Sequence, residues 1–352
     1  MKIAITADNH LTSVDIHPER FEVLRGILRE CGKLGVDQLL IAGDLFDQSP
    51  HNLADFEAAY KEARPDDLQV IVIPGNHDAD LLPGSLAAEG LTVLTEPTLL
   101  EVEGSFALLL VPYKVGTTLG EHIAPFRDQL TPDQWALISH GDWLGGLRAP
   151  DANEPGVYMP LNRTDLVSYR PAMVLLGHIH RPADDGLIHY VGSPCPLDIN
   201  ETGLRRFLLL DTDTKAVSDL KVDSPVLYFN ETVVLLPVDD EEAYLRDQLA
   251  EHIAQWDVPA GWEDRVQVRL RLTGYVADRS AAEKVAKQQL KQFNLYEGAL
   301  DLAELYHTQD ADRIEIARQA QAWVEQLEWS EGYREPTKAE ILRQALGVIY
   351  GG

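Results

Sequence analysis

Cysteine, long apolar runs and positive charge are all scarce in this sequence of 352 residues. The two cysteines, Cys31 and Cys195, are too few for a disulfide-stapled secreted scaffold, so a reducing compartment is expected. No apolar run approaches the roughly 18 residues of a membrane span, and the apolar run from Ile3 leaves no room for a signal peptide. We therefore expect a soluble, cytoplasmic protein with no membrane segment.

Basic residues are outnumbered throughout the chain. Lys and Arg total 30 against 57 Asp and Glu, a formal net charge of −27, and neither 1–225 nor 226–352 forms a basic arm. Nucleic-acid binders normally carry a basic patch, because phosphate neutralisation supplies much of their affinity. This composition argues against DNA, although a carboxylate-rich site that holds divalent cations can receive phosphate through those cations.

The texture of the sequence changes after Ser224-Pro225. Before that point, apolar strand-like runs alternate with helix-like stretches such as 19–34 and 55–64, which is typical of a layered α/β domain. After it, strand-like and helix-like segments such as 266–272 and 241–255 indicate a smaller α+β cap. The predicted domains are a layered α/β domain at 1–224, an α+β cap at 225–308 and C-terminal helices, a possible partner-docking region, at 309–352.

Two helices are expected at the end of the chain. The stretch 311–327 places apolar residues on one helical face: Ile316, Ala320, Trp323 and Leu327. Thr337 and Glu340 have the spacing of a capping box ahead of a second helix over 341–349. The apolar stripe fits either ordinary core packing or a docking face, and the sequence leaves both open.

Five polar clusters carry the chemical signal. They are Asp8-Asn9-His10, Gly43 to Asp47, Gly75 to Asp78, His140-Gly141 and Gly177 to His180. Each follows a strand-like apolar run: Ile3–Ala7, Leu39–Ala42, Val70–Pro74, Trp135–Ile138 and Met173–Leu176. Each cluster alone could be a turn or a structural histidine. Loops at the carboxyl ends of strands converge in an open α/β sheet, so five such clusters together predict one site.

The residue types in these clusters predict a pair of divalent metal ions. A mixture of Asp, Asn and His suits manganese, iron or zinc. Asp8 and His10 lie two positions apart, so both side chains can project from one side of an extended strand end. Asp44 has two oxygens and can bridge ions about 3.5–4 Å apart. The candidate ligands are Asp8, His10, Asp44, Asn76, His140, His178 and His180.

The ordered clusters resemble those of the calcineurin-like metallophosphoesterases over residues 1 to about 200. The resemblance implies that Asp8, His10, Asp44 and His180 hold one ion, and that Asp44, Asn76, His140 and His178 hold the other. It makes His77 the catalytic imidazole, which stabilises or protonates the leaving oxygen. The predicted pair of cations would position a phosphodiester while a metal-activated hydroxide attacks the phosphorus. Asp47 or Asp78 would orient His77. For Asp47, a turn or helix-capping carboxylate is an equally good interpretation.

Segments outside the metal motifs resemble the SbcD-type nucleases more narrowly. They are Ile41 to Pro50 (IAGDLFDQSP), Gly177 to Pro182 (GHIHRP), Tyr190 to Glu201 (YVGSPCPLDINE) and, more weakly, Val266 to Gly274. This resemblance implies an Mn²⁺-dependent DNA exonuclease or endonuclease of DNA repair and recombination, with Fe²⁺ or Zn²⁺ as alternative metals. It also implies a homodimer and an SbcC-like coiled-coil ATPase partner. The alternative is a phosphodiesterase of cyclic nucleotides or other small phosphoesters, which suits the acidic composition better.

Overall fold

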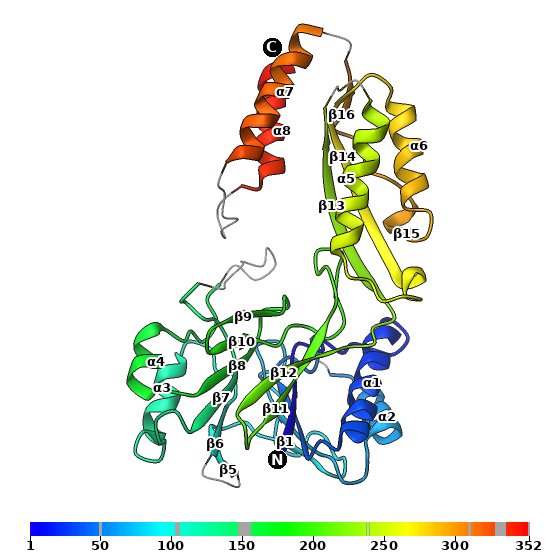
Figure 1. Cartoon of the computed structure of the whole chain (residues 1–352). Coiled ribbons are helices and arrows are strands. Elements are labelled where there is room, and N and C mark those ends of the chain that lie inside the picture. The colour runs from blue at the N-terminus through cyan, green and yellow to red at the C-terminus, as the bar shows by residue number, and fades with distance from the viewer. Residues whose placement is uncertain are drawn as a thin grey trace. The chain divides into compact units, whose positions relative to one another are not determined.

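The computed structural model describes residues 1–48, 51–102, 106–146, 156–236, 238, 240–308, 311–327 and 336–350. The chain forms two compact units (Figure 1). The first unit comprises Met1–Leu197 and Arg205–Pro225, and the second comprises Asp198–Leu204 and Val226–Gly352.

Two six-stranded sheets build the first unit. One has the order β12 (Ala216–Lys221), β11 (Arg206–Asp211), β1 (Lys2–Thr6), β2 (Gln38–Ala42), β3 (Gln69–Ile73), β4 (Leu91–Val93). The other has the order β5 (Thr98–Val102), β6 (Phe106–Val111), β7 (Trp135–His140), β8 (Met173–Gly177), β10 (Ile188–Tyr190), β9 (Ala183–Asp185). Side chains of both sheets, such as Ile5 and Leu40 with Leu110 and Ile138, share one buried core. The predicted layered α/β fold is confirmed.

The described residues of the first unit include four helices. They are α1 (Pro18–Leu34), α2 (Leu53–Ala63), α3 (Leu119–Ile123), which continues into the 3₁₀ turn η1 (Ala124–Phe126), and α4 (Arg163–Tyr169). Their ends follow local rules. Pro18 opens α1, and Gly35 ends it in the left-handed conformation at φ 60°. Asn52 caps α2 by accepting from Asp55 N. The short helices α3 and α4 both begin with a capping box.

The polar clusters lie at the carboxyl ends of parallel strands. The first three follow β1, β2 and β3, which are neighbours in one sheet, and the last two follow β7 and β8, which are neighbours in the other. The expected apolar runs are these five strands, and their residues are almost all buried. Packing of the two sheets against each other therefore brings the five loops to one place.

A parallel sheet with helices forms the second unit. Its strands are β13 (Leu227–Leu235), β14 (Val266–Val276), β15 (Asn294–Leu295) and β16 (Leu305–His307). Helices α5 (Glu241–Gln255) and α6 (Arg279–Gln289) bury residues against alternate side chains of β14, including Val268, Leu270 and Leu272. The 3₁₀ turns η2 (Glu263–Arg265) and η3 (Tyr296–Gly298) complete this unit.

The last two helices, α7 (Ala311–Gln326) and α8 (Lys338–Tyr350), lie side by side (Figure 1). Ala317 and Val324 of α7 pack in a small core with Val234 and Leu236. The apolar stripe does not form that core: Ile316 is 53% exposed, Trp323 69% and Leu327 43%. One residue along a helix turns the face by about 100°. That rotation puts the buried positions 317 and 324 beside, and not on, the stripe.

The capping box of Thr337 and Glu340 is present at the start of α8, where Glu340 N donates to Thr337 Oγ1 and Thr337 N donates to Glu340 Oε2. Among the helices of the described residues, none combines the length and apolarity needed to cross a membrane.

Candidate metal centre

Main-chain hydrogen bonds join the loops of the site, and several of the loop residues have left-handed backbone conformations. Asp8 N donates to Gly43 O over 3.1 Å, and His10 N donates to Asp44 O over 3.0 Å. Asp8, His10, Asp44 and His178 all have left-handed φ values, of 54°, 45°, 50° and 89°. Such conformations are strained for these residue types and persist only where the surroundings enforce them. The strain therefore falls on the predicted ligands.

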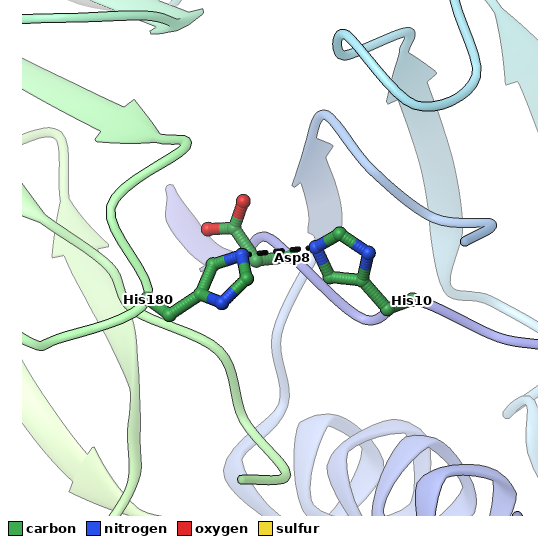
Figure 2. A group of neighbouring side chains, drawn as sticks. All are labelled: Asp8, His10 and His180. Carbon is green, nitrogen blue, oxygen red and sulfur yellow. Dashed lines mark hydrogen bonds between the residues drawn. The ribbon is translucent and has the colours of Figure 1, made fainter. Parts of the chain in front are cut away.

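One group of predicted ligands comprises Asp8, His10 and His180, whose candidate ligand atoms all lie within 4.8 Å of one another. The Nε2 atoms of His10 and His180 approach to 3.0 Å (Figure 2). Asp44 Oδ2 lies 3.6 Å from His10 Nε2. Three separate loops thus bring the four residues predicted for one ion to the same place.

The other group is centred on Asn76. Its Oδ1 lies 2.7 Å from His140 Nε2 and 3.1 Å from His178 Nδ1. Asp44 Oδ2 is also near, 3.2 Å from His140 Nε2. Asp44 therefore contacts both groups, which is the geometry that a bridging carboxylate requires.

Glycines leave room for these ligands. A Cβ on Gly43 would lie 2.1 Å from Nδ1 of His140, and a Cβ on Gly75 would lie 2.1 Å from Oδ1 of Asp44. Neither distance is compatible with a side chain. The glycines of the motifs are therefore required by the close approach of the ligands.

His77 lies at the edge of the first group and is positioned by main-chain atoms. Its ring centroid is 4.7 Å from that of His10. Its main-chain N–H donates to Asp44 Oδ1 over 2.9 Å. Its Nδ1 is 2.6 Å from the carbonyl oxygen of Asp47, whereas the carboxylate of Asp47 is 4.0 Å away. That carboxylate contacts His10 Nδ1 at 3.1 Å. The structure thus differs from the expected pairing, because the Asp47 side chain faces a ligand histidine.

Asp78 contacts main-chain nitrogens of two neighbouring loops. It is fully buried, and its two oxygens accept from Gly75 N at 2.6 Å and Phe46 N at 3.2 Å. Burial and the nearby carboxylate of Asp44 raise the pKa of Asp78 to about 6. Its contacts indicate that it holds the loops after β2 and β3 together.

Charge coupling is strong among the ligands. Burial raises the pKa of Asp8. Burial opposes ionisation of Asp44 as well, but His140, His10 and His77 hold its pKa well below the usual range. Burial alone would lower the pKa of His140, yet the carboxylates of Asp44 and Asp8 raise it to about 10. Metal ions would displace the protons of these charged histidines, because an imidazole binds a metal in its neutral form.

The donor set fits divalent cations. Asp8 Oδ2 is buried and has no hydrogen-bond partner among the described residues. Two imidazole nitrogens also face each other at 3.0 Å, where at most one proton can lie between them. A buried carboxylate oxygen with no donor is costly unless a cation compensates it. The mixture of carboxylate, amide and imidazole suits Mn²⁺, Fe²⁺ or Zn²⁺.

Three buried residues near the ligands were not identified from the sequence. Asp142 Oδ1 lies 3.8 Å from His178 Nε2. Arg20 donates to the carbonyl oxygen of His10, and Arg205 donates to that of His180. The spacing of Asp142, two positions after His140, could have suggested it. Nothing in the sequence distinguishes the two arginines from surface residues.

Fold and donor set together define a metal-dependent hydrolase. The model of the calcineurin-like phosphoesterase family matches residues 1–182, which is more than half of the chain. The chain belongs to this family. No curated protein matches the sequence.

Two solved structures resemble part of the chain. One is described as the structural and functional characterisation of a novel archaeal phosphodiesterase; it is 16% identical, covers 63% of this chain and 99% of its own, and has a TM-score of 0.32. The other is a hypothetical protein from Thermus thermophilus, also 16% identical, covering 63% of this chain and 98% of its own, with a TM-score of 0.39.

Proposed function

We propose that this phosphoesterase is an Mn²⁺-dependent DNA nuclease of the SbcD type, with exonuclease and endonuclease activity in DNA repair or recombination. The observation that carries phosphodiester hydrolysis is the position of Asp44. Its Oδ2 lies 3.6 Å from His10 Nε2 and 3.2 Å from His140 Nε2, and its Oδ1 accepts from the main-chain N–H of His77. Two ligand groups and the main chain of His77 therefore share a single carboxylate.

The chain's own residues would perform defined tasks in this reaction. When bound, two divalent ions supply Lewis acidity for the phosphoryl oxygens and a more acidic water. Asp44 would hold the two ligand groups in register. The contact of His77 Nδ1 with the carbonyl oxygen of Asp47 places a proton on Nδ1, so exchange with the substrate falls to Nε2. An imidazolium there would donate to the departing sugar oxygen.

DNA as the substrate is supported by features outside the metal motifs. The segments Ile41 to Pro50 and Tyr190 to Glu201 resemble those of the SbcD-type nucleases. A second folded unit follows the part that matches the family. The acidic charge of −27 favours the alternative, a phosphodiesterase of cyclic nucleotides or other small phosphoesters.

A substrate comparison tests this proposal. Purified protein with Mn²⁺ should release nucleotides from linear duplex DNA faster than it hydrolyses a cyclic nucleotide or a chromogenic diester. Chelation of the metal should abolish both the cleavage and the binding of DNA, because the protein surface offers little positive charge. The Asp44→Asn variant, prepared identically, reports contaminating nucleases. Hydrolysis of only the small substrates would contradict the nuclease proposal and support the alternative.

The proposal includes partners that the resemblance implies. They are a second copy of this chain and a coiled-coil ATPase. The exposed stripe of Ile316 and Trp323 on α7, with Leu327 directly after it, supports a docking role for the C-terminal helices, since apolar side chains at helical spacing suit a partner helix.

A further inference from the structure

Two buried arginines lie against the histidines of the first ligand group. Arg20, in the first turn of α1, is 7% exposed, and Arg205, just before β11, is 1% exposed. Burying a guanidinium is costly unless its hydrogen bonds are satisfied. Each of the two donates to the main-chain carbonyl of a predicted metal ligand, and the Nε of Arg20 has no hydrogen-bond partner among the described residues.

Arg20 secures His10 in two ways. Its Nη1 donates to the carbonyl oxygen of His10, whose main chain is in the left-handed conformation at φ 45°. Its charge also lies near Asp47, whose carboxylate contacts His10 Nδ1 at 3.1 Å. Main chain and ring of one ligand thus depend on the same short network.

Arg205 secures His180 in a similar manner. Its Nη2 donates to the carbonyl oxygen of His180 and to Ser193 Oγ, and its Nε donates to Ser193 O over 2.8 Å. Ser193 N in turn donates to His180 O over 3.0 Å. The loop after β8 is therefore bound to the chain entering β11.

The two arginines converge on one pair of ligands. His10 and His180, whose carbonyls they hold, are the residues whose Nε2 atoms lie 3.0 Å apart (Figure 2). Cys195 lies near both guanidiniums: burial raises its pKa to about 12, while the charges of Arg20 and Arg205 act in the opposite direction. The pair of ligands and the pair of arginines thus form one local assembly.

The second ligand group is held differently. The ring of His140 is fixed by the carbonyl oxygen of Ala42, 3.0 Å from its Nδ1, and by Asn76 Oδ1, 2.7 Å from its Nε2. These contacts come from the last residue of β2 and from the loop after β3. Neither contact involves Arg20 or Arg205. His178 of this group lies in the same loop as His180, so loss of an arginine should affect the second group less than the first.

We propose that Arg20 and Arg205 are positioning residues that hold His10 and His180 in place for one of the two metal ions. This inference depends on the proposed function, because it assumes two ions. Loss of either guanidinium should release a strained loop and weaken the ion bound by His10 and His180. The ion held by the group around Asn76 should be weakened less, since that group shares only Asp44 and the loop of His178 with the first group.

Calorimetric titration of the metal-free protein with Mn²⁺ tests the proposal. Wild type should bind two equivalents. Arg20→Met and Arg205→Met should each weaken one equivalent by about 10–100-fold, as loss of groups that orient ligands typically does, and weaken the other markedly less. The double variant should fall short of the product of the two effects, because both residues act on one ion.

Arg206→Met is the matched control. Arg206 is also 7% exposed, but it contacts Asp184 and Asp219. Its loss should lower the melting temperature and leave both equivalents intact. Arg20→Lys and Arg205→Lys keep the charge while losing the planar fork, and they should weaken the same equivalent if the Met variants fold poorly.

The results separate two failures. The positioning role is wrong if wild type binds two equivalents and the Arg20 and Arg205 variants bind Mn²⁺ as well as Arg206→Met does. It is also wrong if these variants bind Mn²⁺ more tightly, because that would mean that the arginine charge only repelled the ion. If wild type itself binds fewer than two, the dinuclear function and this inference both fall.

Discussion

At the scale of single residues, the imidazole of His77 and the carboxylate of Asp47 have separate contacts. His77 Nδ1 donates to the main-chain carbonyl of Asp47, so a change of the Asp47 side chain leaves this bond possible. The Asp47 carboxylate contacts His10 instead, and the hydrogen bond with His10 holds the pKa of Asp47 below its usual range. Proton transfer and ligand orientation can therefore be tested by different substitutions.

We predict that His77→Asn retains Mn²⁺ binding and lowers kcat by about 10²–10⁴-fold, the usual range for loss of a general acid. Asp47→Asn should instead weaken Mn²⁺ binding, because it removes the negative partner of His10. Steady-state kinetics on the preferred substrate and calorimetric titration with Mn²⁺ check both variants. Wild-type turnover in His77→Asn at full metal occupancy would disprove the catalytic role.

At the scale of elements, α5 is joined to β13 by a partly buried network. Glu231 of β13 accepts from Trp256 Nε1 and contacts His252 Nδ1, both at 2.8 Å. Burial opposes ionisation of Glu231, but these two contacts lower its pKa. The hydrogen bond with Glu231 raises the pKa of His252 against the effect of burial. The network therefore links a strand to the end of the helix that covers it.

The stability contribution of this network should depend on pH. Glu231 stabilises the fold above its ordinary pKa of 4.5 and loses that effect as pH falls through its lowered value. His252 stabilises it below 6.5 and loses that effect as pH rises through its raised value. Glu231→Gln should therefore lower the free energy of unfolding most between pH 4.5 and pH 6.5. The expected loss is about 0.5–1 kcal/mol, because both groups are partly exposed.

Chemical denaturation at several pH values measures this difference. Asp247→Asn, on an exposed position of the same helix, is the control and should show no such window. An effect of Glu231→Gln that does not change with pH would argue against an ionic contribution.

At the scale of the whole molecule, net charge and assembly are connected. A chain of charge −27 repels a polyanion except where bound cations reverse the local potential. Delivery of DNA to the site would then benefit from a partner that contributes basic surface. The proposed coiled-coil ATPase would meet this need, and α7 offers it an exposed apolar stripe.

We predict that Trp323→Ser reduces co-elution with a coiled-coil ATPase encoded in the same genome, and leaves the melting temperature near that of wild type, since Trp323 is largely exposed. Gln326→Ser, also exposed on α7, should bind the partner normally. Size-exclusion chromatography of the co-expressed proteins makes the comparison. Equal co-elution of both variants would contradict docking through the stripe.

The strands that lead to the site and the residue types of its ligands were predictable because they are local properties. Apolar runs such as Met173–Leu176 form buried strands wherever two layers cover them, and their following loops must lie at one edge. The capping box of Thr337 and Glu340 is likewise complete within four residues. Such patterns need no knowledge of distant contacts.

Tertiary packing settled the features that depend on distant main-chain atoms. Every residue has a carbonyl oxygen, so no pattern of side chains predicts that Arg20 donates to the carbonyl oxygen of His10 or that Arg205 donates to that of His180. For the same reason, the sequence did not predict the hydrogen bond from His77 to the carbonyl oxygen of Asp47. The sequence also did not predict which face α7 buries. Trp323 and Val324 are adjacent in the chain but lie on neighbouring faces of the helix, and the structure buries the face of Val324.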